Sequence, residues 1–79
     1  MNITKGEYCQ FSLVSRLQLA KEFGTCLKEI WFDSLFIQIY RMNDFYVEIH
    51  YQAPLLKPVY AEPLKNDGML SFYQNQPSS

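Results

Sequence analysis

The fold is decided by the stretch WFDSLFIQIYRMNDFYVEIHY, Trp31 to Tyr51, in which side chains alternate in character along the chain. Alternation with a period of two is typical of β-strands, whose successive side chains point to opposite faces. In the last part of the stretch one set is an ordinary core face, Phe45, Val47, Ile49 and Tyr51, and the other set is Tyr46, Glu48 and His50. The pattern predicts three consecutive antiparallel strands, Thr25–Phe32, Leu35–Arg41 and Phe45–Tyr51.

The connections between these strands set the expected register. A two-residue turn at Asp33-Ser34 places Ile30 opposite Ile37. A three-residue loop at Met42–Asp44 places Ile37 opposite Ile49, whereas a two-residue loop would mix apolar with polar faces and is rejected. The helices are therefore expected to cover the isoleucine face.

Two helices are predicted upstream. Thr4-x-x-Glu7 fits a capping box and opens a short helix to about Phe11. Ser12 is a suitable cap for a second helix, Leu13–Phe23. Its apolar spacing predicts one buried face, which comprises Leu13, Leu17, Ala20 and Phe23. Arg16 falls toward the solvent side, and Gly24 is expected in the left-handed conformation that often ends a helix.

Downstream, the chain is interrupted by prolines, which cannot donate to a sheet ladder, so a strand at Val59–Glu62 would be an edge strand. Met69–Tyr73 is a candidate fifth strand after a turn at Asn66–Gly68, and residues 74–79 are expected to be a disordered tail. Residues 1–73 are thus predicted to form one α+β domain, with one or two N-terminal helices on one face of a meander of three to five strands.

Composition excludes several classes of function. The net charge of −1 and the scattered Lys and Arg argue against a dedicated binder of nucleic acid or of an anionic membrane. No signal peptide, membrane span, metal-ligand spacing or phosphate loop is visible, so we expect a cytoplasmic protein without a cofactor. Cys9 and Cys26 are expected to be reduced and mostly buried, with a disulfide between them as the lesser alternative.

The expected register produces an outer sheet face with three cross-strand rows, two of them aromatic or apolar. A solvent-facing sheet surface should be polar, so this one should be covered. The cover would be the C-terminal segment, a second copy of the chain, or a different partner or flat ligand. The prediction is a protein–protein interaction or homo-oligomerisation module whose contact residues are Trp31, Phe36, Tyr40, Tyr46, Glu48 and His50.

The alternative is a small-molecule or enzymatic site around Glu48 and His50, which lie two positions apart on one strand face. Glu29 and Glu48 would flank Gln38 in the middle row, so that two carboxylates could approach each other. An aromatic sheet face can also stack nucleic-acid bases, but the acidic middle row and the missing basic rim disfavour that use.

The order of segments also resembles a group of short bacterial proteins. It is carried by KEFGTCL (Lys21–Leu27), WFDSLFIQIYRMNDFYVEIHY and AEPL (Ala61–Leu64). These segments are similar to those of short uncharacterised proteins of Bacteroides-like bacteria, in which a helix is followed by strands with a Phe-Tyr-Val-Glu-x-x-Tyr run. The resemblance covers about Gln10 to Leu64, and it implies an architecture without implying a site.

Overall fold

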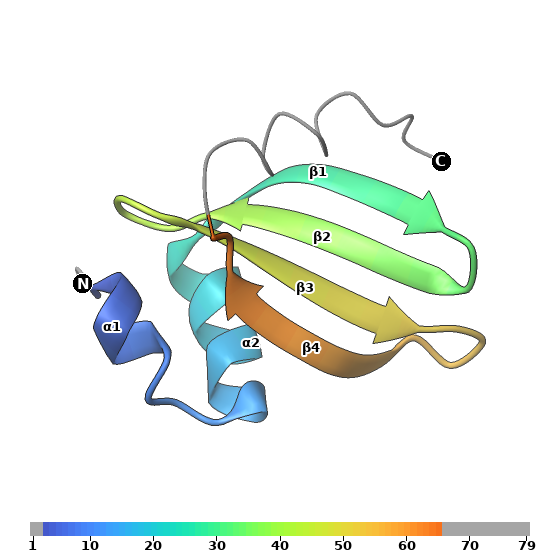
Figure 1. Ribbon diagram of the computed structural model, residues 1–79, viewed down its shortest axis with the longest axis horizontal. Coiled ribbons are helices and arrows are strands. Elements are labelled where there is room, and N and C mark those ends of the chain that lie inside the picture. Colours follow the sequence, from blue (N-terminus) through green and yellow to red (C-terminus); the bar gives the residue numbers. More distant parts are fainter. Residues whose placement is uncertain (1–2, 66–79) are drawn as a thin grey trace.

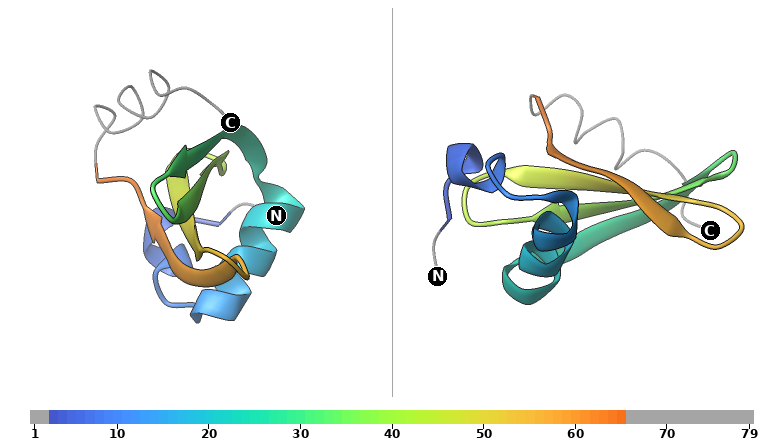
Figure 2. Two further views of the ribbon diagram at one scale, coloured as in Figure 1. Left: turned by 90° about the vertical axis from the view of Figure 1, so that its right-hand side faces the viewer. Right: turned by 90° about the horizontal axis from the view of Figure 1, so that it is seen from below.

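The computed structural model describes residues 3–65. In this part of the chain, two helices, α1 (Lys5–Tyr8) and α2 (Leu13–Phe23), precede one antiparallel sheet. Its strands are β1 (Thr25–Phe32), β2 (Leu35–Arg41), β3 (Tyr46–Gln52) and β4 (Lys57–Pro63), paired in chain order. Both helices lie on one face of the sheet, which we call the helix face, and the other is the far face (Figures 1 and 2). The predicted α+β meander is confirmed, with four strands within residues 3–65.

Local capping signals determine where the helices begin. The Thr4 hydroxyl accepts from the Glu7 amide and the Glu7 carboxylate accepts from the Thr4 amide, so the capping box is formed. Helix α1 ends at Tyr8, earlier than predicted. The Ser12 side chain caps α2, whose bounds match the prediction.

Glycine is required at position 24 by close packing and not by the predicted left-handed backbone conformation. Its φ of −100° and ψ of 170° are extended, so the left-handed assignment is wrong. A Cβ at this position would lie 2.7 Å from the Ala20 carbonyl oxygen and 2.9 Å from the Met42 sulfur. Close approach between the end of α2 and the sheet therefore excludes any larger residue without a local shift.

The register between β1 and β2 is as predicted at the turn, with Ile30 opposite Ile37. Asp33, the first of the two turn residues, has a φ of 60°, as a tight hairpin turn requires. Farther along, a bulge between Cys26 and Lys28 places Cys26 opposite Tyr40. Cys26 is therefore on the helix face, whereas uninterrupted alternation places it with Ile30.

The predicted register between β2 and β3 is wrong by one position. Tyr40 lies opposite Val47, and Ile39 lies opposite Glu48. The Met42 amide donates to the Phe45 carbonyl at 2.8 Å, so only Asn43 and Asp44 lie between the paired residues. The rejection of a two-residue loop is therefore wrong. Met42 and Phe45 are both buried, and Phe45 packs on Tyr8 with ring centroids 5.7 Å apart. Burial of the loop against α1 therefore sets the register.

Because of this shift by one position, the isoleucine side chains of β1 and β2 that were expected to face the helices lie on the opposite face of the sheet. Val47 and Ile49 point to the helices as predicted, but they share that face with Phe36, Gln38 and Tyr40. The isoleucines at positions 30, 37 and 39 lie instead on the far face, where they form a smaller buried cluster with Leu64. The expectation that the helices cover the isoleucines of β1 and β2 is thus wrong.

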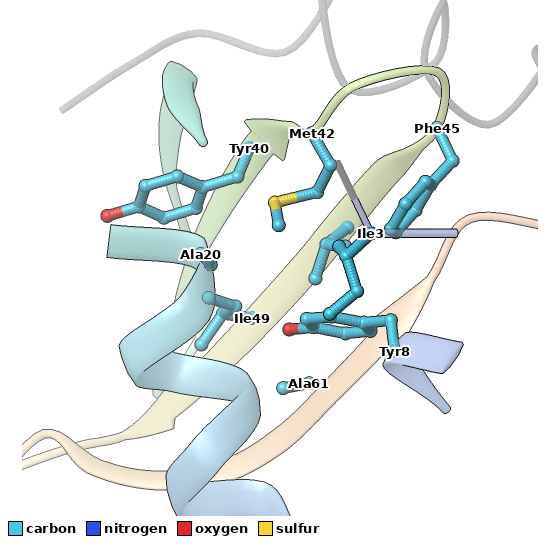
Figure 3. Close-up of a cluster of buried hydrophobic side chains, with 9 residues drawn as sticks. Ile3, Tyr8, Ala20, Tyr40, Met42, Phe45, Ile49 and Ala61 are labelled. Carbon is cyan, nitrogen blue, oxygen red and sulfur yellow. The ribbon is translucent and has the colours of Figure 1, made fainter. Parts of the chain in front are cut away.

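The main core fills the space between the helices and the sheet. Figure 3 shows Tyr40 and Ile49 on the sheet side of this core and Ala20 of α2 facing them. Met42, Phe45 and Tyr8 close the end near α1 (Figure 3). Phe23 is 44% exposed, so its predicted place in the buried helix face is wrong.

Strand β4 forms one edge of the sheet, as its prolines predict, and Pro58 and Pro63 both lie within it. A bulge between His50 and Tyr51 interrupts its pairing with β3. The predicted fifth strand at Met69–Tyr73 and the tail at 74–79 lie outside the described residues.

Candidate functional site

The structure does not place the six predicted contact residues on one surface. Trp31, Phe36 and Tyr40 lie on the helix face with Val47 and Ile49. Tyr46, Glu48 and His50 lie on the far face, because the β2–β3 register differs by one position from the predicted one. The prediction of one aromatic outer face is therefore wrong. Three of its residues lie on the helix face and three on the far face.

On the helix face, three rings form a row across neighbouring strands. Trp31 and Phe36 have ring centroids 4.8 Å apart, and Phe36 and Tyr51 have centroids 5.9 Å apart. Paired aromatic side chains of this kind stabilise a sheet. Sequence reasoning found the pair Trp31–Phe36 but assigned Tyr51 to the other face, since only the correct β2–β3 register reveals it.

The row borders a shallow hollow of about 230 Å³. Its lining residues come from α2, β2, β3 and the β3–β4 loop: Lys21, Phe36, Gln38, Tyr51 and Leu56. Gln38 Nε2 donates to Glu29 Oε2 at 2.9 Å, and the buried Gln38 Oε1 has no hydrogen-bond partner among the described residues. Burial raises the pKa of Tyr51, so its phenol remains neutral at physiological pH. The hollow thus combines apolar walls, one ammonium group and an unused acceptor.

The β1–β2 turn and the β3–β4 loop lie at the same end of the sheet, which extends past α2 (Figures 1 and 2). We call Trp31, Phe36, Tyr51 and Leu56 the distal patch. Trp31 is 41% exposed and Leu56 39% exposed, and neighbouring Leu55 is 87% exposed. Exposed apolar side chains gathered at one end are unusual for a surface with no partner.

Leu56 has a second unusual property. Its φ is 55°, in the left-handed region where a bulky residue without special support is an outlier. Strained backbone of this kind concentrates at binding and catalytic sites. The conformation places a large apolar side chain against the hollow at a conformational cost, which is consistent with a role for that side chain beyond folding.

The far face carries the second candidate cluster. Glu48 is 8% exposed, and its Oε2 lies 3.4 Å from His50 Nε2. The His50 and Tyr60 rings stack with centroids 4.5 Å apart. Burial raises the pKa of Tyr60, and the Glu48 and Glu62 carboxylates raise it further. The predicted proximity of Glu48 and His50 is confirmed, while Glu29 is on the other face, so the proposed pairing of its carboxylate with Glu48 is wrong.

The cysteines differ from their predicted environment. Cys9 and Cys26 are free thiols and both are exposed, so the prediction that they are mostly buried is wrong. Within residues 3–65, no group of three or more His, Cys, Asp or Glu side chains is arranged to hold a metal ion. Neither of the two described helices has the length and apolar character needed to cross a membrane.

Comparisons with known proteins give no match among family models, curated proteins or solved structures.

Proposed function

We propose that the protein is an association module that binds a protein partner through the distal patch. The observation that carries the proposal is the exposure of Trp31 and Leu56 beside the half-buried rings of Phe36 and Tyr51. Aromatic side chains that are partly exposed and partly supported by neighbours are typical energetic centres of protein interfaces. The patch has both properties, because Phe36 supports Trp31 on one side and Tyr51 on the other.

The polar groups around the patch favour a partner with hydrogen-bonding capacity. Lys21 and Gln38 line the same hollow as Phe36 and Leu56. A partner that fills the hollow with an apolar side chain and donates one hydrogen bond would pair with Gln38 Oε1, which has no partner among residues 3–65. A partner that matches only the apolar part would leave that oxygen unsatisfied, which gives the site a means of discrimination.

The experiment compares a patch variant with a matched surface variant. Trp31→Ser combined with Leu56→Ser removes two exposed apolar side chains of the patch, whereas Val14→Ser removes one that is 72% exposed on α2. In affinity capture from the native cell extract, we expect wild type and Val14→Ser to retain the same partner. The patch variant should retain at least tenfold less. Equal retention by all three proteins, with unchanged circular dichroism, would contradict the proposal.

A second candidate function is a small-molecule or acid–base site at Glu48 and His50. It is supported by the contact of a buried carboxylate with an imidazole that also stacks on a phenol. Its test is a small-molecule screen monitored by the NMR signals of the His50 ring, with Glu48→Gln as the comparison. A ligand that shifts these signals in wild type only would support the site, and a screen without such a ligand would count against it.

A further inference from the structure

The two edges of the sheet are protected to very different degrees. On β4, Pro58 and Pro63 have no amide hydrogen to offer, and Arg16 Nη1 donates to the carbonyl oxygen of Ala61 at 2.9 Å. Proline and covering side chains are the usual means of preventing a strand from joining another sheet. The edge strand β4 is thus closed to further pairing over much of its length.

Strand β1 lacks these protections. It is eight residues long, contains no proline, and lies at the other edge of the sheet as far as residues 3–65 define it. Its bulge is confined to the beginning of the strand, between Cys26 and Lys28. Leu27, Trp31 and Phe32 are all exposed, with exposed fractions of 37%, 41% and 60%. An edge strand that exposes large apolar side chains is a site for pairing with another strand, and the charged residues Lys28 and Glu29 in its middle restrict the register of that pairing.

The turn geometry identifies the backbone groups available for pairing. Phe32 and Leu35 close a two-residue hairpin, and such a closing pair exchanges hydrogen bonds within the hairpin. Because inward and outward directions alternate along an antiparallel strand, Ile30 also bonds inward, toward Ile37. Glu29 and Trp31 therefore direct their amide and carbonyl groups toward the open edge.

We infer that this edge of β1 pairs antiparallel with β1 of a second copy of the chain. Identical antiparallel strands related by a two-fold axis pair around one central residue, with side chains of the same face opposite each other. Centring on Lys28 or on Glu29 opposes like charges, and centring on Trp31 opposes Glu29 to Asp33.

Centring on Ile30 opposes no like charges. It places Ile30 opposite its own equivalent, Lys28 opposite Phe32, and Glu29 opposite Trp31. The last pair consists of the two residues whose backbone groups point outward, so all of their donors and acceptors find partners. Charge and backbone direction thus favour the same arrangement, in which two four-stranded sheets become one continuous sheet. A centre at Leu27 would fall on the bulge, where the ladder is already disrupted.

This inference rests on the proposed function, since it names a second copy as the partner and Trp31 belongs to both surfaces. The test uses the full chain and two substitutions at one position. Glu29→Pro removes an outward amide hydrogen while sparing the bonds to β2, and Glu29→Ala keeps that hydrogen. Both lose the carboxylate that accepts from Gln38, so they differ only at the backbone.

In light scattering, wild type and Glu29→Ala should have twice the chain mass of 9.4 kDa at high concentration, and Glu29→Pro should have the single-chain mass. A wild type that stays at the single-chain mass at every concentration overturns the inference, while the capture experiment still decides the proposed function. A Glu29→Pro protein that is folded and still doubled in mass also overturns it, and indicates self-association through another surface.

If Glu29→Pro does not fold, hydrogen exchange of the wild type tests whether β1 pairs with a second copy. The amides of Glu29 and Trp31 should exchange at least tenfold more slowly as the protein concentration rises through the dimerisation range. Exchange that is independent of concentration overturns the inference, including the case in which residues of the same chain occupy the edge.

Discussion

Arg16 Nη1 donates a hydrogen bond of 2.9 Å to the backbone carbonyl of Ala61, and thereby joins the middle of α2 to the edge strand β4. The same guanidinium forms an ion pair with Glu62 and donates from Nη2 to the Cys9 carbonyl at 2.6 Å. Its Cζ also lies 5.8 Å from the centre of the Tyr8 ring. One side chain therefore fixes the relative positions of α1, α2 and the sheet.

Replacement of Arg16 should be among the more destabilising changes in the chain. Arg16→Met retains most of the apolar stem but leaves two carbonyls and the Glu62 carboxylate without their donor. We therefore expect the free energy of unfolding to fall by about 2–4 kcal/mol. Urea denaturation measures this loss. Glu62→Gln, which removes only the ion pair, should cost about 1 kcal/mol or less, and equal losses in the two variants would contradict the assigned role of Arg16.

The burial of the Arg16 side chain could not be predicted from the sequence. Helical periodicity places it among polar positions of α2, and a charged residue there is normally solvated. Its side chain is only 16% exposed because β4, which lies 45 residues farther along the chain, supplies the carbonyl that it binds. Such a contact depends on tertiary arrangement and leaves no signal in the local sequence.

The registers of the first two hairpins likewise differ in how far the local sequence determines them. A two-residue turn at Asp33-Ser34 fixes the β1–β2 register locally, so the pairing of Trp31 with Phe36 could be predicted. The β2–β3 register depends on burial of Phe45 against Tyr8, a contact between distant segments. Because that register was displaced by one position, the third ring of the aromatic row, Tyr51, could not be assigned to the candidate site.

Gly24 and Gly6 should respond in opposite ways to alanine. At Gly24 a Cβ would meet the Ala20 carbonyl oxygen at 2.7 Å, and backbone cannot move aside cheaply, so Gly24→Ala should lower the free energy of unfolding by about 1–3 kcal/mol. At Gly6 nothing lies within 4 Å of the added atom, so Gly6→Ala should raise stability by about 0.5–1 kcal/mol through helix propensity. Thermal unfolding of both variants checks the contrast, which a destabilised Gly6→Ala would contradict.

Glu7 should contribute to the acid sensitivity of the fold. Hydrogen bonds from the Thr4 backbone and side chain lower the pKa of the Glu7 carboxyl below its ordinary value of 4.5. Its stabilising contribution is therefore present above that value and is lost as the pH falls through the lower, folded-state pKa. Glu7→Gln should lack this part of the acid-induced loss. Denaturation curves from neutral to acidic pH test the expectation, and an identical pH dependence in the two proteins would contradict it.

Tyr8 should make the protein sensitive to alkali. Burial raises the pKa of its phenol well above the ordinary value of 10.0, and the hydroxyl donates to the Arg16 carbonyl at 2.9 Å. Since the folded pKa is the higher one, the stabilisation is complete below pH 10.0 and is lost as the pH rises toward the folded-state pKa. Tyr8→Phe should cost about 1 kcal/mol at neutral pH and should reduce the loss of stability in alkali. A variant that loses stability in alkali as steeply as wild type would show that other tyrosines dominate.

The strained backbone at Leu56 should be measurable as a gain of stability when glycine replaces it. A φ of 55° costs a leucine roughly 1 kcal/mol relative to glycine, so Leu56→Gly should raise the free energy of unfolding by up to about 1 kcal/mol, less whatever packing its half-exposed side chain provides. Leu55→Gly is the matched control: Leu55 has no positive φ and is 87% exposed, so glycine should destabilise the protein slightly through unfolded-state entropy. Urea denaturation of both variants distinguishes these effects. If Leu56→Gly is more stable than wild type and also loses the captured partner, the strained conformation of Leu56 serves binding.

If Leu56→Gly is less stable than Leu55→Gly, packing of the Leu56 side chain against the hollow outweighs its backbone strain. The conformation then needs no functional explanation.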